Sequence, residues 1–156
     1  MQSLKIDFLG KYNELILSAI QSSSDFPNKI CDFIIKEFEL EAAAIFKINN
    51  GGDLELIGKS TTSKKSLSRE IHISCPNCKN IQDNTHSNQF NLQSNCSFNI
   101  TDHIINEGCV LVNVADGQTA LLKVAKKTAF TKSETDNIEL ISDSIKNLLK
   151  LWIGSK

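Results

Sequence analysis

The residues whose types and spacing could do chemistry lie in the middle of the chain. Four of the five cysteines and two of the three histidines fall between residues 75 and 109. Cys75-Pro76-Asn77-Cys78 has a spacing at which two thiolates can bind one tetrahedral metal ion, and Cys96 follows one loop length later. The candidates for a fourth ligand are His86, His103, Cys109 and a water molecule. The pattern predicts a metal site in which structural zinc is favoured over iron or an iron–sulfur cluster.

A second interpretation of the same cysteines stays open. Residues 74–99 are rich in asparagine, glutamine and serine and contain few large apolar side chains, so they cannot fold on apolar burial alone. A bound metal ion would supply the missing constraint. Without a metal, the cysteines are ordinary loop thiols, or Cys75 and Cys78 form a disulfide reversibly.

The overall composition limits the classes of function. With 156 residues, of which 40% are hydrophobic and 22% charged, the chain has the size and composition of one globular domain. Its net charge of −1 argues against nucleic acid or an anionic membrane as a partner, because both require a basic surface. No apolar run is long enough to cross a bilayer, and the N-terminal residues lack the apolar core of a signal peptide. We therefore expect a cytoplasmic protein, where thiols stay reduced.

Two helices are expected before the first strand. Apolar side chains at steps of three, four and seven predict a helix over Leu4–Ile20. Ser22–Asp25 ends it and offers capping oxygens to a second helix, with Pro27 in its first turn. Cys31 adjoins the apolar face of that helix, and we interpret it as a small buried hydrophobe. The face itself consists of Ile30, Phe33, Ile34 and Phe38.

A strand hairpin is expected next. Ala42–Ile48 and Leu54–Lys59 are two strands around an Asn-Asn-Gly-Gly-Asp turn at residues 49–53. The polar, basic stretch 59–68 predicts a loop, and a short strand is expected at residues 70–73.

A second hairpin and a long helix are expected after Gly108. Cys109–Val114 and Thr119–Lys126 are strands around Asp116-Gly117. In the first strand, alternate side chains share a face, so three valines lie on one side and Cys109, Leu111 and Asn113 on the other. Thr131-Lys132-Ser133-Glu134 is a capping box that opens the last helix. Its apolar residues repeat at steps of three and four and are Ile138, Ile141, Ile145, Leu148 and Trp152.

The order of these elements resembles that of the GAF domain, a sensory module related to PAS domains. Three stretches carry the likeness, which spans nearly the whole chain: residues 30–48, residues 109–114 with their hairpin partner, and residues 129–149. The likeness is one of pattern and contains no catalytic string, so it specifies a fold more than an activity. The predicted single domain divides into a first helix (1–24), a helix with a hairpin (25–60), a variable cysteine-containing lid (61–108) and a hairpin with the last helix (109–156).

The resemblance implies an α+β fold with a central antiparallel sheet of about six strands. The N- and C-terminal helices would cover one face, and the lid would cover the other and roof a ligand pocket. In GAF domains the ligand is a cyclic nucleotide, a tetrapyrrole, a small metabolite or iron. Neither of the first two is favoured here, because Asn28-Lys29 is better explained as a helix start and the lid is too polar for a tetrapyrrole. The residues expected at the pocket are Cys109, Leu111, Asn113, Arg69 and His72.

The resemblance also implies a homodimer, because the terminal helices of GAF domains commonly pair between two copies. The residues expected at such an interface are Leu4, Phe8, Ile138, Ile141, Ile145, Leu148 and Trp152. The alternative, that both helical faces cover the sheet of their own chain, has equal weight on the pattern alone.

We therefore expect a cytosolic sensory or regulatory domain, rather than an enzyme, that senses through the metal or redox state of Cys75, Cys78 and Cys96. One alternative is a domain that binds a small metabolite and has a structural zinc in its lid. Another is a thiol-dependent reductase of free methionine sulfoxide, in which Cys109 would react with Cys96 or Cys78 as its partner. The glycine-flanked cysteine motif of that reductase family is absent from the sequence.

Overall fold

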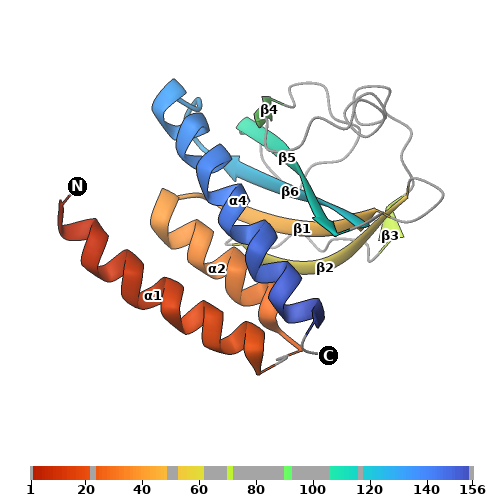
Figure 1. The fold of residues 1–156 in the computed structure, drawn as a ribbon. Helices are drawn as coiled ribbons and strands as arrows, with labels where there is room; N and C mark the ends of the chain where they lie inside the picture. Colours follow the sequence, from red (N-terminus) through yellow and green to blue (C-terminus); the bar gives the residue numbers. More distant parts are fainter. Residues whose placement is uncertain are drawn as a thin grey trace.

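The computed structural model describes residues 2–21, 24–48, 53–61, 70–71, 90–92, 106–115 and 118–154. Two helices open the described chain, the strands follow one another, and a long helix closes it (Figure 1). The elements are α1 (Gln2–Ile20), α2 (Phe26–Phe38), β1 (Ala42–Ile48), β2 (Leu54–Thr61), β3 (Glu70–Ile71), β4 (Phe90–Leu92), β5 (Asn106–Ala115), β6 (Gln118–Lys126) and α4 (Lys132–Gly154).

The described strands form one antiparallel sheet in the order β3-β2-β1-β6-β5-β4. Four strands of seven to ten residues make up its body, and the two edge strands are only two and three residues long. The pairs β1–β2 and β5–β6 confirm the two predicted hairpins, and the pairing of β1 with β6 joins them.

The described strands β2, β5 and β6 extend beyond their expected bounds, and one described strand was not expected. β2 continues to Thr61 because Ser60 and Thr61 pair with β1, so the expected loop over 59–68 cannot start at Lys59. β5 begins at Asn106, before Gly108, because Asn106 and Glu107 pair with the end of β6. β4 was not expected at all, since three residues are too short for an alternating pattern and Phe90–Leu92 is defined only by its pairing with β5.

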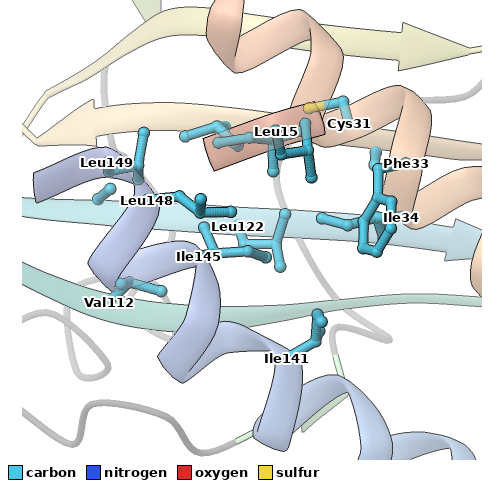
Figure 2. Close-up of a cluster of buried hydrophobic side chains, with 14 of the residues drawn as sticks. Leu15, Cys31, Phe33, Ile34, Val112, Leu122, Ile141, Ile145, Leu148 and Leu149 are labelled. Atoms are coloured by element: carbon cyan, nitrogen blue, oxygen red, sulfur yellow. The ribbon is translucent and has the colours of Figure 1, made fainter. Parts of the chain in front are cut away.

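All three described helices lie on one face of the sheet (Figure 1). Alternation along the strands sends Val110, Val112 and Val114 towards these helices, as predicted, and Leu122 and Val124 of β6 join them. Figure 2 shows the result. Side chains of α4 pack near Val112 and Leu122, and side chains of α1 and α2 complete the cluster on the same face of the sheet. The predicted α+β architecture, with an antiparallel sheet and helices on one face, is confirmed.

The α4 residues predicted for a dimer interface are buried within the chain itself. Their exposed fractions run from 0% to 8%, and all five belong to the core between the helices and the sheet. These are Ile138, Ile141, Ile145, Leu148 and Trp152. They are therefore unavailable to a second copy, because the apolar stripe of α4 is used to cover β5 and β6. For Leu4 and Phe8 the structure describes the helix but not the side chains.

The start of α4 is fixed by the predicted capping box. The Thr131 hydroxyl accepts a hydrogen bond from the Glu134 backbone N–H at 3.2 Å, and the Glu134 carboxylate accepts one from the Thr131 N–H at 2.8 Å. The other oxygen of Glu134 forms an ion pair with Lys126 at the end of β6. The turn between sheet and helix is thus tied at both ends.

The start of α2 is fixed against β2 by a close approach. The side-chain oxygen of Asn28 accepts a hydrogen bond from the Lys59 backbone N–H at 2.8 Å, and the Ser60 hydroxyl donates one to Asp32. Asn28 therefore has a structural role at the helix start, as expected. Gly58 lies beneath Pro27 with no room for a side chain, since a Cβ atom there would lie 2.5 Å from the Pro27 Cβ atom and 2.6 Å from its carbonyl carbon.

A methyl group at this junction should destabilise the protein. We expect Gly58→Ala to lower the free energy of unfolding by roughly 2 to 3 kcal/mol, because the contact involves backbone that cannot move without shifting α2. Gly10→Ala is the matched control: a Cβ atom there meets nothing within 4 Å, and replacing a helical glycine should raise stability by about 0.5 to 1 kcal/mol. Urea unfolding measures both. Equal effects of the two substitutions would contradict the tight α2–β2 contact.

Candidate functional site

The face of the sheet away from the helices has a buried cluster of its own. It is built by the alternate residues of β1, β2, β5 and β6 that point away from α2 and α4. Its buried apolar members are Ala42, Ala44, Phe46, Leu54, Cys109, Leu111, Leu121 and Ala125. We call this surface the far face.

An ion pair lies buried in the far face. The Lys123 ammonium is 3.4 Å from a carboxylate oxygen of Glu107, and their side chains are only 1% and 2% exposed. Lys123 stands opposite Cys109 on β5 and opposite Ala44 on β1, and Glu107 lies two residues before Cys109 on the same strand. An ammonium, a carboxylate and a thiol therefore share one patch in the middle of an apolar surface.

Burying two charges costs more free energy than a surface pair would. Removing both ions from water is expensive, and their mutual attraction offsets this cost only when geometry and additional hydrogen bonds are good. Apolar residues of similar size would often be as stable or more stable at such positions. A buried ion pair of this kind is a candidate functional site.

Sequence reasoning missed Glu107 and Lys123. The expected strand began at Cys109, which left Glu107 outside the pattern. The signal for Lys123 was present, since it is in phase with Leu121 and Ala125 and is the one polar residue in the stretch from Ala120 to Ala125. A lysine in the middle of such a strand, opposite a cysteine, marks the position.

The predicted pocket residues are only partly placed. Cys109 and Leu111 are buried in the far face. Asn113 follows in the same phase but is exposed, and its side-chain oxygen accepts a hydrogen bond from the Thr119 hydroxyl at 3.4 Å. Arg69 and His72 lie outside the described residues.

Most of the predicted metal ligands also lie outside the described residues. They are Cys75, Cys78, Cys96, His86 and His103. Of the candidate ligands the structure places only Cys109, and within the described ranges no group of three or more metal-ligating side chains comes together. No described helix is long and apolar enough to span a membrane.

Cys31 is a buried hydrophobe, as predicted. It is fully buried in the core on the helix side. Burial raises the pKa of its thiol far above the ordinary value, and the neighbouring Asp32 carboxylate raises it further. A buried thiol held in its neutral form is a poor nucleophile.

No protein family's sequence profile matches the chain, and no curated protein resembles it in sequence. Solved structures do. The phycoerythrobilin-bound GAF domain of a cyanobacterial phytochrome is 10% identical, with a TM-score of 0.68 over 92% of this chain and 94% of that one. The GAF domain of an Acinetobacter phosphoenolpyruvate-protein phosphotransferase is 10% identical, with a TM-score of 0.65 over 90% and 91%. This chain has the GAF fold.

A third solved structure with this fold is an enzyme. The type II free methionine-R-sulfoxide reductase of Thermoplasma acidophilum is 17% identical, with a TM-score of 0.61 over 86% of this chain and 94% of that one. At such identities the likeness concerns the fold, and the GAF fold alone does not select among activities.

The effects of Lys123 and Glu107 on stability should depend on each other. We expect Lys123→Met to lower the free energy of unfolding by about 3 kcal/mol or more, because it leaves the Glu107 carboxylate buried without its ion partner. The double variant Lys123→Met/Glu107→Leu should recover most of that loss. Lys132→Met, which breaks an exposed ion pair with Asp136, is the control and should have little effect. Additive losses in the double variant would contradict a coupled buried pair.

Proposed function

We propose that this protein is a sensory or regulatory domain of the GAF type that binds a small polar molecule at the far face. The observation that carries the proposal is the buried Lys123–Glu107 pair beside Cys109. In such a patch the ammonium can donate hydrogen bonds to a ligand and the carboxylate can accept them. Apolar neighbours such as Phe46 and Leu111 would contact the rest of the ligand.

The chemistry of the far face favours a small polar ligand over a pigment. Some structural neighbours are GAF domains with bound bilins, which are large tetrapyrroles. A tetrapyrrole would need a broad apolar surface, whereas two charges lie in the middle of this one. A metabolite with polar groups at one end fits the patch better.

The sheet offers a direct path from the far face to α4. Lys123 points into the far face, while its neighbours Leu122 and Val124 point into the core on the helix side. In Figure 2, Leu122 lies beside Ile145 and Leu148 of α4. A ligand that shifts β6 by a small amount would therefore change the packing of α4, which is the coupling between sites that a sensor needs.

The cysteine-centred site of the middle segment remains part of the proposal. Cys75 and Cys78 have the spacing of half a zinc knuckle, and Cys96 is a third thiolate candidate one loop length later. We propose that a zinc ion holds this segment together, with a sensing role for its occupancy or for the redox state of its thiols.

A homodimer also remains a proposal, but through other residues of the terminal helices than the buried α4 stripe. The exposed large apolar residues of the terminal helices are Leu17, Ile20, Leu140, Leu151 and Ile153. Two copies would meet through Leu17, Ile20, Leu140 and Leu151, since the stripe facing the sheet is already buried and Ile153 lines a hollow on the helix side of the sheet.

A reductase of free methionine sulfoxide is the second candidate function. It is favoured by the likeness to the Thermoplasma enzyme and by the position of Cys109 beside a buried ammonium. Release of methionine from methionine sulfoxide in the presence of a dithiol reductant, lost in Cys109→Ser, would establish it in place of the sensory function.

Ligand binding at the far face can be tested without knowing the ligand. Screened against small polar metabolites, the wild-type protein should show a melting temperature that rises with the concentration of at least one compound. At a ligand concentration of a hundred times Kd, binding should raise the free energy of unfolding by about 2 to 3 kcal/mol. The Lys123→Met/Glu107→Leu variant should lose that shift. A ligand that stabilises both proteins equally would contradict a site at these charges.

The zinc site has an independent test. Elemental analysis of protein purified without oxygen should give about one zinc per chain, falling to near zero in Cys75→Ser/Cys78→Ser. Cys31→Ser is the matched control and should keep the metal, because Cys31 lies buried on the helix side. Iron with visible absorption would indicate the iron alternative, and the absence of any metal would contradict the site.

A further inference from the structure

A separate hollow lies on the helix side of the sheet, beside the last turns of α4. It has a volume of about 310 Å³, within the range of small-molecule sites. Its walls come from four strands and from α4. We call it the α4-end hollow. Because Val114 and Ala120, which line it, belong to the helix-side core, it lies on the opposite side of the sheet from Lys123 and Glu107.

The floor of the hollow is apolar and already formed. Leu149 and Trp152 of α4 lie over Val114 of β5 and Ala120 of β6, and each of these side chains is buried to more than nine-tenths. The Trp152 ring packs on Phe26 of α2, with the ring centroids 6.0 Å apart and the planes tilted by 39°. An aromatic ring held in this way gives an apolar ligand group a rigid surface, so little conformational entropy is lost on binding.

The rim of the hollow carries one positive and one negative charge. Lys47 of β1 and Glu55 of β2 both line it and are directly opposite each other in the strand register. Lys47 is exposed and Glu55 half-buried. In the part of the chain that the structure describes, no ion pair links the two side chains. Each is thus available to a ligand group of opposite charge.

We propose that the α4-end hollow binds a small zwitterion with an apolar side chain, of the class of the free aliphatic and aromatic α-amino acids. Such a molecule carries a carboxylate for Lys47, an ammonium for Glu55 and an apolar group for the floor. A simple anion would leave Glu55 beside it as a repelling charge, and a long-chain lipid would exceed the volume. The proposal is independent of ligand binding at the far face.

The position of the hollow gives binding a structural consequence. Leu149 and Trp152 belong to the last two turns of α4 and line the hollow. A ligand seated in the hollow against Leu149 and Trp152 adds contacts to the end of this helix. The amides of residues 149–154 should therefore exchange more slowly with solvent when the ligand is bound.

Calorimetric titration with matched ligands tests the assignment of each charge. The wild-type chain should bind L-phenylalanine or L-leucine, and should bind N-acetyl-L-phenylalanine and L-phenylalaninamide more weakly, since each of these lacks one charge. Lys47→Met should weaken the binding of the zwitterion roughly tenfold and leave the binding of L-phenylalaninamide unchanged. Glu55→Gln should also weaken the binding of the zwitterion, but should leave the binding of N-acetyl-L-phenylalanine unchanged. Lys150→Met, an exposed change on α4 outside the hollow, is the control.

Three outcomes would overturn the proposal. One is that millimolar amino acids give no heat of binding in the titration and do not slow the amide hydrogen exchange of residues 149–154. Another is equal binding of the zwitterion and its neutralised analogues, unaffected by Lys47→Met and Glu55→Gln. The third is binding that survives these two changes and is lost in Lys123→Met/Glu107→Leu, which would move the ligand to the far face and support the proposed function instead.

Discussion

The pairing of β1 with β6 is the contact on which the rest of the structure depends. Each hairpin forms from residues close in sequence, but a two-stranded hairpin alone is marginally stable in water. Six residues of β1 pair with β6, and the Glu41 backbone N–H donates a 2.8 Å hydrogen bond to the Ala125 carbonyl just before β1 begins. This contact joins residues about 80 positions apart and turns two hairpins into one surface that the helices can cover.

Once the sheet exists, alternation divides its residues into two environments with different chemistry. The helix side receives valines, leucines and isoleucines, and the three described helices bury them. The far face receives small and apolar residues together with Lys123 and Glu107. Adjacent residues on one strand therefore serve different purposes, and a change on one face is felt on the other through the shared backbone.

The last helix shows how one apolar pattern can fit two different partners. Its apolar repeat predicted both a helix and a contact surface, and both exist. The surface packs against β5 and β6 of the same chain, because covering the sheet requires an apolar stripe of just that length. What remains outward on α4 is a sparse set, in which Leu140 is the most exposed large apolar residue. The buried end of the same helix, around Trp152, forms the wall of the α4-end hollow.

The sequence by itself determined the local elements and, through their order, the GAF fold. Periodicity located α1, α2 and α4, turn residues located both hairpins, and Thr131 with Glu134 located the start of the last helix, because each of these signals acts between residues close in the chain. Only the tertiary structure brought Glu107, Lys123 and Cys109 together, and set Lys47 and Glu55 at the rim above Trp152. Those neighbours are created by strand register and by the packing of α4, and register is decided by contacts across the whole sheet. The strand Phe90–Leu92 shows the same limit, since its three residues carry no pattern and are defined by β5 alone.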